Sequence, residues 1–513
     1  MEDSRNDSAG DALRKKQATT GGDVDMRKMA IQFMAVIMSA VLFVPAGARE
    51  VEAAAGLRAV SVAGGTAHGL AAWSDGTVTG WGYNKFGQVG DGTTIDQYIP
   101  RRISGLAGIV QVAAGSNNSF ALSAEGEVWG WGATYGTYTS TDPLSPVQKS
   151  GPLKLGGLQN VASIATNGYT GLAVKKDGTA TMWYPSYESA ENSPMRMIVR
   201  YLSLPGISGI KSAAIAGNDA LFLTGDGAVK QLSIYNSVYG RVRWASDPLT
   251  VNTLADSGIR QIAASGDNDA FLLRTDGQVL RWNRTLQTPS AVSGLGSSYK
   301  LQTGSNKLFV VKMNGTLWQW NYNAGEAVKP FQIPNAQSIT EVWGTTGTFG
   351  FAQRKDGTLL GWGEGFYGGL ASGSGTVTND DTIEAIPVQQ PLQYTVNGQA
   401  VDFYGTSAVI GGKLYVPYTS VFKALGVKAN MSLSNPDPKY NNYRFNVWSF
   451  VYGDTTLHIK TTDPAQLFIN GKKSEQAVTL HIYSDTTIFP LQQLSELLGI
   501  RVNWNPATGE VRL

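Results

Sequence analysis

Residues 75–92 read DGTVTGWGYNKFGQVGDG, and the opening of this stretch sets a pattern that returns along most of the chain. An Asp-Gly pair is a common two-residue turn between antiparallel strands, because both central residues take positive φ, which glycine adopts freely and aspartate tolerates. Trp81 follows Asp75 by six residues. The same spacing joins a turn residue to an aromatic or aliphatic residue at Glu125 and Trp131, Asp177 and Trp183, Asp226 and Leu232, Asp276 and Trp282, Asn314 and Trp320, and Asp356 and Trp362.

Other positions around each turn are apolar in every copy. Five residues before the turn stand Leu70, Phe120, Leu172, Leu221, Phe271, Phe309 and Phe351. Three residues after its first member stand Val78, Val128, Ala180, Val229, Val279, Leu317 and Leu359. The position four residues before the turn is apolar as well, so the incoming strand is hydrophobic on both faces and must be covered on both sides.

Successive turns are 38 to 52 residues apart, a spacing typical of propellers and solenoids. One hairpin unit of this size cannot bury two apolar faces, whereas a ring of stacked sheets buries both and removes exposed sheet edges. The sequence therefore predicts an all-β, seven-bladed propeller over residues 59–390.

Three of the repeats also resemble those of the regulator of chromosome condensation family. Residues 60–103 contain Ala-Gly, His, Asp-Gly, Trp-Gly, Asn and Gly-Gln-Val-Gly in the family's order, and the second and seventh copies fit well. The third to sixth copies are degenerate, since Trp-Gly becomes Trp183-Tyr184, Leu232-Ser233, Trp282-Asn283 and Trp320-Asn321. The resemblance implies the fold, and much less about an activity.

Composition excludes several classes of function. The chain has 513 residues, 61 glycines, 13 tryptophans and no cysteine, so neither a disulfide framework nor a thiolate metal site can form. A formal net charge of +2, without a strongly basic stretch, gives no electrostatic case for nucleic-acid binding.

The N-terminal region has the pattern of an export signal preceded by a polar extension. Residues 1–25 are polar and aperiodic, as in a disordered extension or a start assigned too early, which leaves Met1 and Met26 as alternatives. Residues 26–55 contain Arg27 and Lys28, an apolar run and small residues, the order found in a secretory signal peptide. The apolar run has about fifteen residues, fewer than the ~20 of a stable membrane span. We expect cleavage near Ala55 and no membrane span afterwards.

A second repeat begins after a glycine-rich and proline-containing boundary. Val396-Asn397-Gly398 is matched by Ile469-Asn470-Gly471, and the same interval separates each glycine from Pro417 or Pro490. Each proline opens an amphipathic segment that ends at a glycine, which is the usual punctuation of a helix. Residues 392–513 are therefore predicted to be a small α+β domain built from a duplicated β-β-α unit.

This duplicated unit resembles the copper amine oxidase N-terminal-like, or stalk, domain. The family's pattern stands here as Val396-Asn397-Gly398, Tyr415-Val416-Pro417, Val421–Gly426 and Val502-Asn503-Trp504-Asn505, with Asn505 in place of the usual aspartate. The resemblance implies a non-catalytic module of exported bacterial envelope proteins.

Few side chains are available for catalysis or metal binding. The three histidines are His68, placed where the repeat family often has histidine inside a strand, and His458 and His481 in strand-like runs without a further nitrogen or sulfur ligand. Calcium could be offered oxygens by Gly90-Asp91-Gly92 or Asn379-Asp380-Asp381, although neither follows a calcium-loop spacing. We predict no catalytic residue, no cofactor and no metal site.

A closed ring would bring the loops of the first, second and seventh copies together. Aromatic residues on glycine-rich loops suit glycan stacking or protein anchoring, although for each residue taken alone the favoured interpretation is that it fills a gap between blades. The candidate binding residues are Tyr83, Asn84, Phe86, Asp91, Tyr135, Tyr138, Phe366 and Tyr367.

The sequence therefore favours an exported, non-enzymatic binding protein in the cell envelope or secreted from the cell, with a protein or a wall or extracellular glycan as partner. Its C-terminal module would tether or space the propeller. Two alternatives remain. One is a GTPase binder that resembles a guanine nucleotide exchange factor, and the other is a carbohydrate-active enzyme that uses paired carboxylates.

Overall fold

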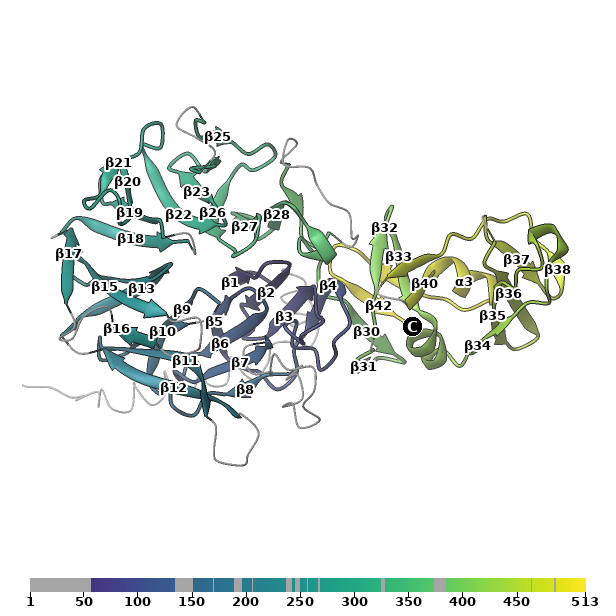
Figure 1. Ribbon diagram of the computed structural model, residues 1–513. Helices are drawn as coiled ribbons and strands as arrows, with labels where there is room; N and C mark the ends of the chain where they lie inside the picture. The colour runs from purple at the N-terminus through teal and green to yellow at the C-terminus, as the bar shows by residue number, and fades with distance from the viewer. Residues whose placement is uncertain are drawn as a thin grey trace, which may run out of the picture. The chain divides into compact units, whose positions relative to one another are not determined.

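Short antiparallel sheets make up most of the structure, which is a computed structural model (Figure 1). It describes residues 57–513 except 134–150, 169, 189–195, 205, 237–241, 245–249, 256, 266–267, 324–327, 373–383, 404, 463 and 484–485. The predicted polar extension and signal segment, Tyr135, Tyr138 and Asn379-Asp380-Asp381 lie outside the described residues.

Seven sheets follow one another in the described part of residues 59–387, and each is built from strands that are consecutive in the chain. The first sheet has β1 (Ala59–Gly64), β2 (His68–Trp73), β3 (Val78–Gly82) and β4 (Gln97–Arg102). The second has β5 (Ile109–Ala114), β6 (Asn118–Ser123), β7 (Val128–Gly132) and β8 (Leu153–Lys154). The third has β9 (Val161–Thr166), β10 (Gly171–Lys175), β11 (Ala180–Glu188) and β12 (Arg196–Leu204). The fourth has β13 (Ile210–Ala216), β14 (Asp219–Thr224), β15 (Val229–Asn236), β16 (Val242–Trp244) and β17 (Val251–Ala255).

The remaining three of these sheets have the same order. The fifth has β18 (Ile259–Ala264), β19 (Ala270–Arg274), β20 (Val279–Trp282) and β21 (Ser290–Ala291). The sixth has β22 (Ser298–Gly304), β23 (Lys307–Lys312), β24 (Leu317–Trp320) and β25 (Phe331–Gln332). The seventh has β26 (Ile339–Trp343), β27 (Phe349–Arg354), β28 (Leu359–Gly363) and β29 (Ile386–Pro387). In Figure 1 the sheets follow one another around a circle, from purple β1 to green β28.

Apolar side chains join each sheet to the next, and this contact explains the columns of the sequence. The residue five before each turn shares a buried cluster with the residue six after the turn of the following sheet. Phe120 meets Trp183 edge to face at 5.4 Å between ring centroids, and Phe309 meets Trp362 in the same way at 5.0 Å. Phe351 of the seventh sheet meets Trp81 of the first at 5.5 Å. The fold is thus a β-propeller in which the last sheet packs on the first.

The Asp-Gly turns also connect neighbouring sheets. Ile109 at the start of the second sheet donates its backbone N–H to the carbonyl of Gly76 in the turn of the first, and this bond recurs at later turns. A Cβ atom at Gly126 would lie only 2.7 Å from the backbone nitrogen of Val161, and the residue has a φ of +90°. Glycine is therefore needed here both for its backbone conformation and for the close approach of the next sheet.

Residues 393–512 contribute three further sheets. The first consists of β30 (Gln393–Val396), β31 (Gln399–Val401), β41 (Asn503–Asn505) and β42 (Glu510–Arg512). The second consists of β32 (Ala408–Ile410), β33 (Lys413–Pro417), β39 (His481–Tyr483) and β40 (Thr486–Pro490). The third consists of β34 (Lys428–Leu433), β35 (Asn446–Tyr452), β36 (Thr455–Lys460), β37 (Gln466–Ile469) and β38 (Lys472–Lys473).

Two helical segments cover these sheets at corresponding places in the C-terminal repeat. Pro417 directly precedes a π-helical segment η4 (Tyr418–Phe422), and Pro490 precedes the α-helix α3 (Leu491–Leu497). Val421, Phe422, Leu494 and Leu498 are buried in one shared core. Two short 3-10 segments, η2 (Phe366–Gly368) and η5 (Pro438–Tyr440), are also present. Across the described part of the chain, no helix has the length and apolar character that a membrane crossing requires.

Candidate functional site

The loop that follows β3 is held by a buried asparagine. Asn84 is fully buried, and its backbone N–H donates to Asp96 Oδ1 at 2.8 Å. Its side-chain amide donates to the carbonyl of Ile95 at 3.0 Å, while its Oδ1 accepts from the backbone N–H of Val89 at 2.9 Å. Asn84, one of the predicted binding residues, therefore holds both arms of the loop together.

Asp91, a second predicted binding residue, also has partners inside the loop. Its Oδ1 accepts hydrogen bonds from the backbone N–H and the hydroxyl of Thr93, at 3.0 and 2.8 Å, and from the Asn84 amide. Its Oδ2 accepts from Gln97 Nε2 at 2.9 Å. These bonds form a polar network that fixes the loop, so Asp91 acts on the shape of the site.

Four of the predicted aromatic residues are carried by two loops that contact one another. The ring of Tyr83 lies 5.0 Å from that of Tyr367 and 6.2 Å from that of Phe86, between centroids. Phe366 and Tyr367 are 43% and 54% exposed, which is high for aromatic side chains. The structure thus brings Tyr83, Phe86 and Tyr367 of the first and seventh sheets together, with Phe366 adjacent in the chain; we name these four residues the aromatic cluster.

The backbone around Tyr367 is fixed by the first sheet. Tyr367 has a φ of +53° inside η2, a left-handed conformation that bulky residues rarely adopt. The indole N–H of Trp81 donates to the carbonyl of Gly369 at 2.8 Å, and a Cβ atom at Gly368 would lie 2.8 Å from the Tyr98 ring. Such a conformation persists only where the surroundings hold it, and it is found most often at functional sites.

The surroundings of Tyr83 move the pKa of its hydroxyl further above neutral pH. Partial burial raises the pKa of Tyr83, and the nearby Asp96 and Tyr367 raise it further. The phenol is therefore a neutral hydrogen-bond donor at physiological pH. An aromatic face with such a donor can stack on an apolar surface and donate one hydrogen bond, which suits binding.

A cavity of about 740 Å³ runs along the inner strands of the seven sheets. Its walls carry small or uncharged residues, and no lysine, arginine, aspartate or glutamate is among the described residues that line it. Gln111 Nε2 donates to the carbonyl of Ile164 at 2.8 Å, and Gln111 Oε1 accepts from the Ile164 N–H at 2.9 Å. Gln261 bonds Leu301 of the next sheet in the same manner. The polar side chains of the cavity therefore serve contacts between sheets.

Sequence reasoning missed these two glutamines, although the repeats contain a signal for them. Gln111 and Gln261 occupy the same place in VQVAA and RQIAA, as the third residue of each inner strand. Comparing the repeats upstream of the turn, as far as the inner strand, would have aligned these two glutamines.

His68 is buried between the first and second sheets. Its Nε2 lies 3.0 Å from Ser119 Oγ, and that hydroxyl donates to the carbonyl of Gln88 at 2.7 Å. Burial lowers the pKa of His68 from its ordinary value to about 3, so the imidazole is neutral. His68 therefore has a packing role, as its position in the repeat favoured. Within the described residues, no group of three or more His, Asp or Glu side chains is arranged to hold a metal ion.

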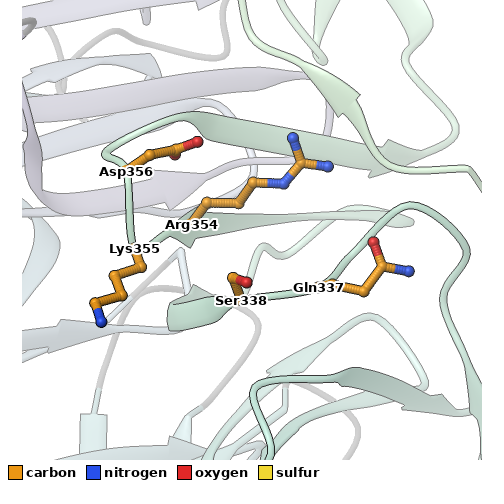
Figure 2. Close-up of a pocket in the computed structure, with 5 residues that line it drawn as sticks. All are labelled: Gln337, Ser338, Arg354, Lys355 and Asp356. Atoms are coloured by element: carbon orange, nitrogen blue, oxygen red, sulfur yellow. The ribbon is translucent and has the colours of Figure 1, made fainter.

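A shallow hollow of about 470 Å³ lies at the turn of the seventh sheet, where Gln337, Ser338, Arg354, Lys355 and Asp356 surround it (Figure 2). Arg354 and Lys355 extend in different directions in Figure 2, and Arg354 Nη2 donates to the carbonyl of Asn335 at 2.6 Å. Hydrogen bonds from Thr358 lower the pKa of Asp356. These groups support the hairpin, and they do not converge on one point.

Two family models match parts of the chain. The model of the regulator of chromosome condensation (RCC1) repeat matches residues 75–122, and the model of the copper amine oxidase N-terminal domain matches residues 395–513.

Curated relatives share the repeat over part of their length. The mitochondrial RCC1 domain-containing protein RUG3 of Arabidopsis thaliana is 28% identical over 256 residues, which are 46% of this chain and 56% of that protein. The human RCC1-like G exchanging factor-like protein is 32% identical over 191 residues, 34% of this chain and 39% of that protein. This chain spans about half the length, or less, of these relatives.

A solved structure, that of Prp20p from Saccharomyces cerevisiae, is 20% identical and covers 58% of this chain and 83% of its own, with a TM-score of 0.43. The chain thus contains a regulator of chromosome condensation repeat within its β-propeller and a copper amine oxidase N-terminal domain at its C-terminal end.

Proposed function

We propose that this protein is an exported, non-enzymatic binding protein whose aromatic cluster captures a protein or a cell-wall or extracellular glycan. The single observation that carries the proposal is the exposure of Phe366 and Tyr367 on loops fixed from both the first and the seventh sheet. Binding energy concentrates in exposed aromatic residues that are held rigid before the partner arrives.

The proposal includes the architecture that holds the cluster. The seven sheets are the blades of a closed propeller over residues 59–390, and the contact between Phe351 and Trp81 supports closure. Residues 392–513 form an α+β module that tethers or spaces the propeller at the cell envelope. Residues 26–55 act as the signal peptide. N-terminal sequencing of the exported protein tests the last point, since recovery of residues 1–55 in that protein would contradict it.

A capture experiment tests the binding surface. The double variant Tyr83→Ala and Tyr367→Ala should lose capture of its partner from cell-wall and culture-supernatant fractions by at least about thirtyfold, because even one aromatic anchor contributes about 2 kcal/mol or more. Its thermal unfolding should stay close to that of the wild type, since Tyr367 is exposed and Tyr83 is only partly buried.

Met313→Ala is the matched control, because Met313 is 71% exposed and lies beside a turn on the other side of the propeller. Equal capture by the double variant and by this control would remove the aromatic cluster from the proposal.

The exchange-factor alternative rests on the name of the human relative, the RCC1-like G exchanging factor-like protein. A nucleotide-release assay with candidate GTPases separates it from capture of a surface partner. An enzyme that uses paired carboxylates has less support, because the buried Asp219 and Asp269 each bond an arginine.

A further inference from the structure

Each of the seven inner strands contains a β-bulge at the same place. The register between the first and second strands of every sheet slips by one residue, two positions into the inner strand. The residues left without a partner in the ladder are Val60, Val110, Ala162, Lys211, Arg260, Tyr299 and Thr340. Bulges turn a side chain away from the direction that a regular strand would give it.

These residues lie on the side of the propeller opposite to the aromatic cluster. Ala59 pairs with Trp73, and the Asp-Gly turn follows Trp73 directly, so the inner strands begin on the side of the turns. The aromatic cluster follows the third strands, whose far ends are on the other side. The bulged residues therefore lie at the turn-side ends of the seven strands whose later residues line the central cavity; we name them the bulge ring.

The bulge ring divides into an apolar and a cationic half. Val60 and Val110 are 48% and 46% exposed, and Ala162 of the third sheet is exposed beside them. The fourth to sixth sheets supply Lys211, Arg260 and Tyr299 at the same position.

The cationic half is held in place. Arg260 Nη2 donates to the carbonyls of Ser298 and Tyr299, at 2.8 Å each, and its guanidinium lies 5.8 Å from the centre of the Tyr299 ring. The ammonium group of Lys300, the next residue in the chain, lies 5.4 Å from the centre of the same Tyr299 ring. It also forms an ion pair with Glu341. Asp226 and Asp276, the turn acids of this half, accept hydrogen bonds from their own turns. These bonds lower the pKa of both acids, so both are carboxylates at neutral pH, and Asp276 also pairs with Arg274. Lys211, Arg260, Arg274 and Lys300 thus stand against Asp226, Asp276 and Glu341 at this edge, four cations against three carboxylates.

The bulge explains the backbone, but it does not explain which side chains stand there. The slip occurs in all seven sheets, and in the second to seventh it lies next to the bond that links the inner strand to the preceding turn. Valine, alanine, lysine, arginine, tyrosine and threonine all occupy it, so the backbone is compatible with many side chains. Exposed valines gathered on one half and cations on the other are a surface pattern that such a geometry does not require.

We propose that the bulge ring binds an acidic amphipathic segment of a partner protein. The aliphatic side chains of that segment contact Val60 and Val110, and its carboxylates face Lys211 and Arg260. The charge of the cationic half selects carboxylates, and the uncharged cavity beneath offers them no competing site. This surface is separate from the aromatic cluster, so either proposal can fail without the other.

Fluorescence anisotropy with the full chain tests the inference. The probe is a synthetic amphipathic peptide with glutamates on one face and leucines on the other, and the control peptide has lysines in place of the glutamates. The acidic peptide should bind about tenfold more tightly than the basic one at low salt, and its affinity should fall as salt is raised.

Lys211→Glu and the double variant Val60→Ser and Val110→Ser should each weaken binding of the acidic peptide about tenfold. Tyr83→Ala with Tyr367→Ala should leave this binding unchanged, and circular dichroism verifies that every variant is folded. Equal affinity for both peptides, insensitivity to Lys211→Glu, or tighter binding to anionic lipid vesicles or duplex DNA than to the acidic peptide would overturn the proposal.

Discussion

The contact between the first and second sheets differs in chemistry from the contact between the fourth and fifth. In both, the residue seven before the Asp-Gly turn makes the polar link to a neighbour: His68 in the first sheet and Asp219 in the fourth. The first link is neutral, and the second is ionic.

Neutral groups connect the first two sheets in a continuous chain. His68 Nε2 is hydrogen-bonded to Ser119 Oγ, and the Ser119 hydroxyl donates to the carbonyl of Gln88. That carbonyl also accepts the indole N–H of Trp131 at 2.9 Å. The Gly-Gln-Val-Gly motif of the repeat therefore provides the acceptor for the tryptophan of the next sheet.

The fourth and fifth sheets lack this motif and use an arginine instead. Arg284 Nε and Nη2 donate to the two carboxylate oxygens of Asp219, at 2.7 and 3.0 Å, and the Asp219 hydrogen bonds raise the pKa of Arg284. Gln231 and Ser233 donate to the same carboxylate, which is fully buried.

Further around the propeller, Arg281 bonds Asp269 and lies 5.1 Å from the Tyr322 ring of the sixth sheet. A repeat can thus lose its sequence motif and keep its geometry, because either kind of bond satisfies the same buried position.

The largest expected effect concerns the apolar columns that pack each sheet on the next. Trp131→Ala, between the first and second sheets, should lower the free energy of unfolding by about 3–5 kcal/mol, and Leu232→Ala, at the equivalent position between the third and fourth sheets, by about 2–4 kcal/mol, because the larger side chain leaves the larger cavity. Denaturant titrations followed by circular dichroism measure both. Trp131→Phe is the control that keeps an aromatic ring in place and loses the bond to Gln88 together with part of the packed volume. A loss for Leu232→Ala that exceeds the loss for Trp131→Ala would contradict equivalent packing.

The second effect compares the ionic and neutral links. Arg284→Ala should lower the free energy of unfolding by about 2–3 kcal/mol, because it leaves the buried Asp219 carboxylate without its cation. This loss is smaller than for a fully buried ion pair, because the arginine side chain is half exposed. Ser119→Ala removes one neutral hydroxyl and should cost about 1–2 kcal/mol. The double variant Asp219→Asn with Arg284→Gln should recover part of the loss. Equal costs for the two single variants in the same titration would mean that the charge adds nothing.

The third effect is absent at neutral pH and appears only in acid, at the neutral link. The pKa of His68 is about 3 in the folded protein and about 6.5 when unfolded, so only the unfolded chain takes up the proton between these values. Stability should therefore be constant above pH 6.5 and fall as the pH decreases toward 3, by about 2 kcal/mol at pH 5.

His68→Gln, which keeps a donor near Ser119, should show a flatter profile between pH 6.5 and 4.5. Parallel profiles for this variant and the wild type would show that His68 is not the group responsible.

Much of the propeller could be predicted from the repeat, and less of the candidate binding site. The apolar columns identified residues that are buried between sheets, but not which residues of neighbouring sheets contact one another. The aromatic residues Tyr83 and Tyr367 were identified because a ring brings the first and last copies together. The internal roles of Asn84 and Asp91 were not predicted, because the residue type alone does not distinguish a side chain that binds its own loop from one that binds a partner.

The sequence by itself determined the regular spacing of the hairpin turns, the two apolar columns and the duplicated C-terminal pattern. Each of these depends on local turn chemistry and on burial repeated at a fixed spacing. The tertiary structure alone decided which polar groups meet across sheets, how seven β-bulges surround the cavity, and which aromatic rings stay exposed. These features depend on contacts between residues far apart in the chain, and single positions in an aperiodic set of side chains do not encode their partners.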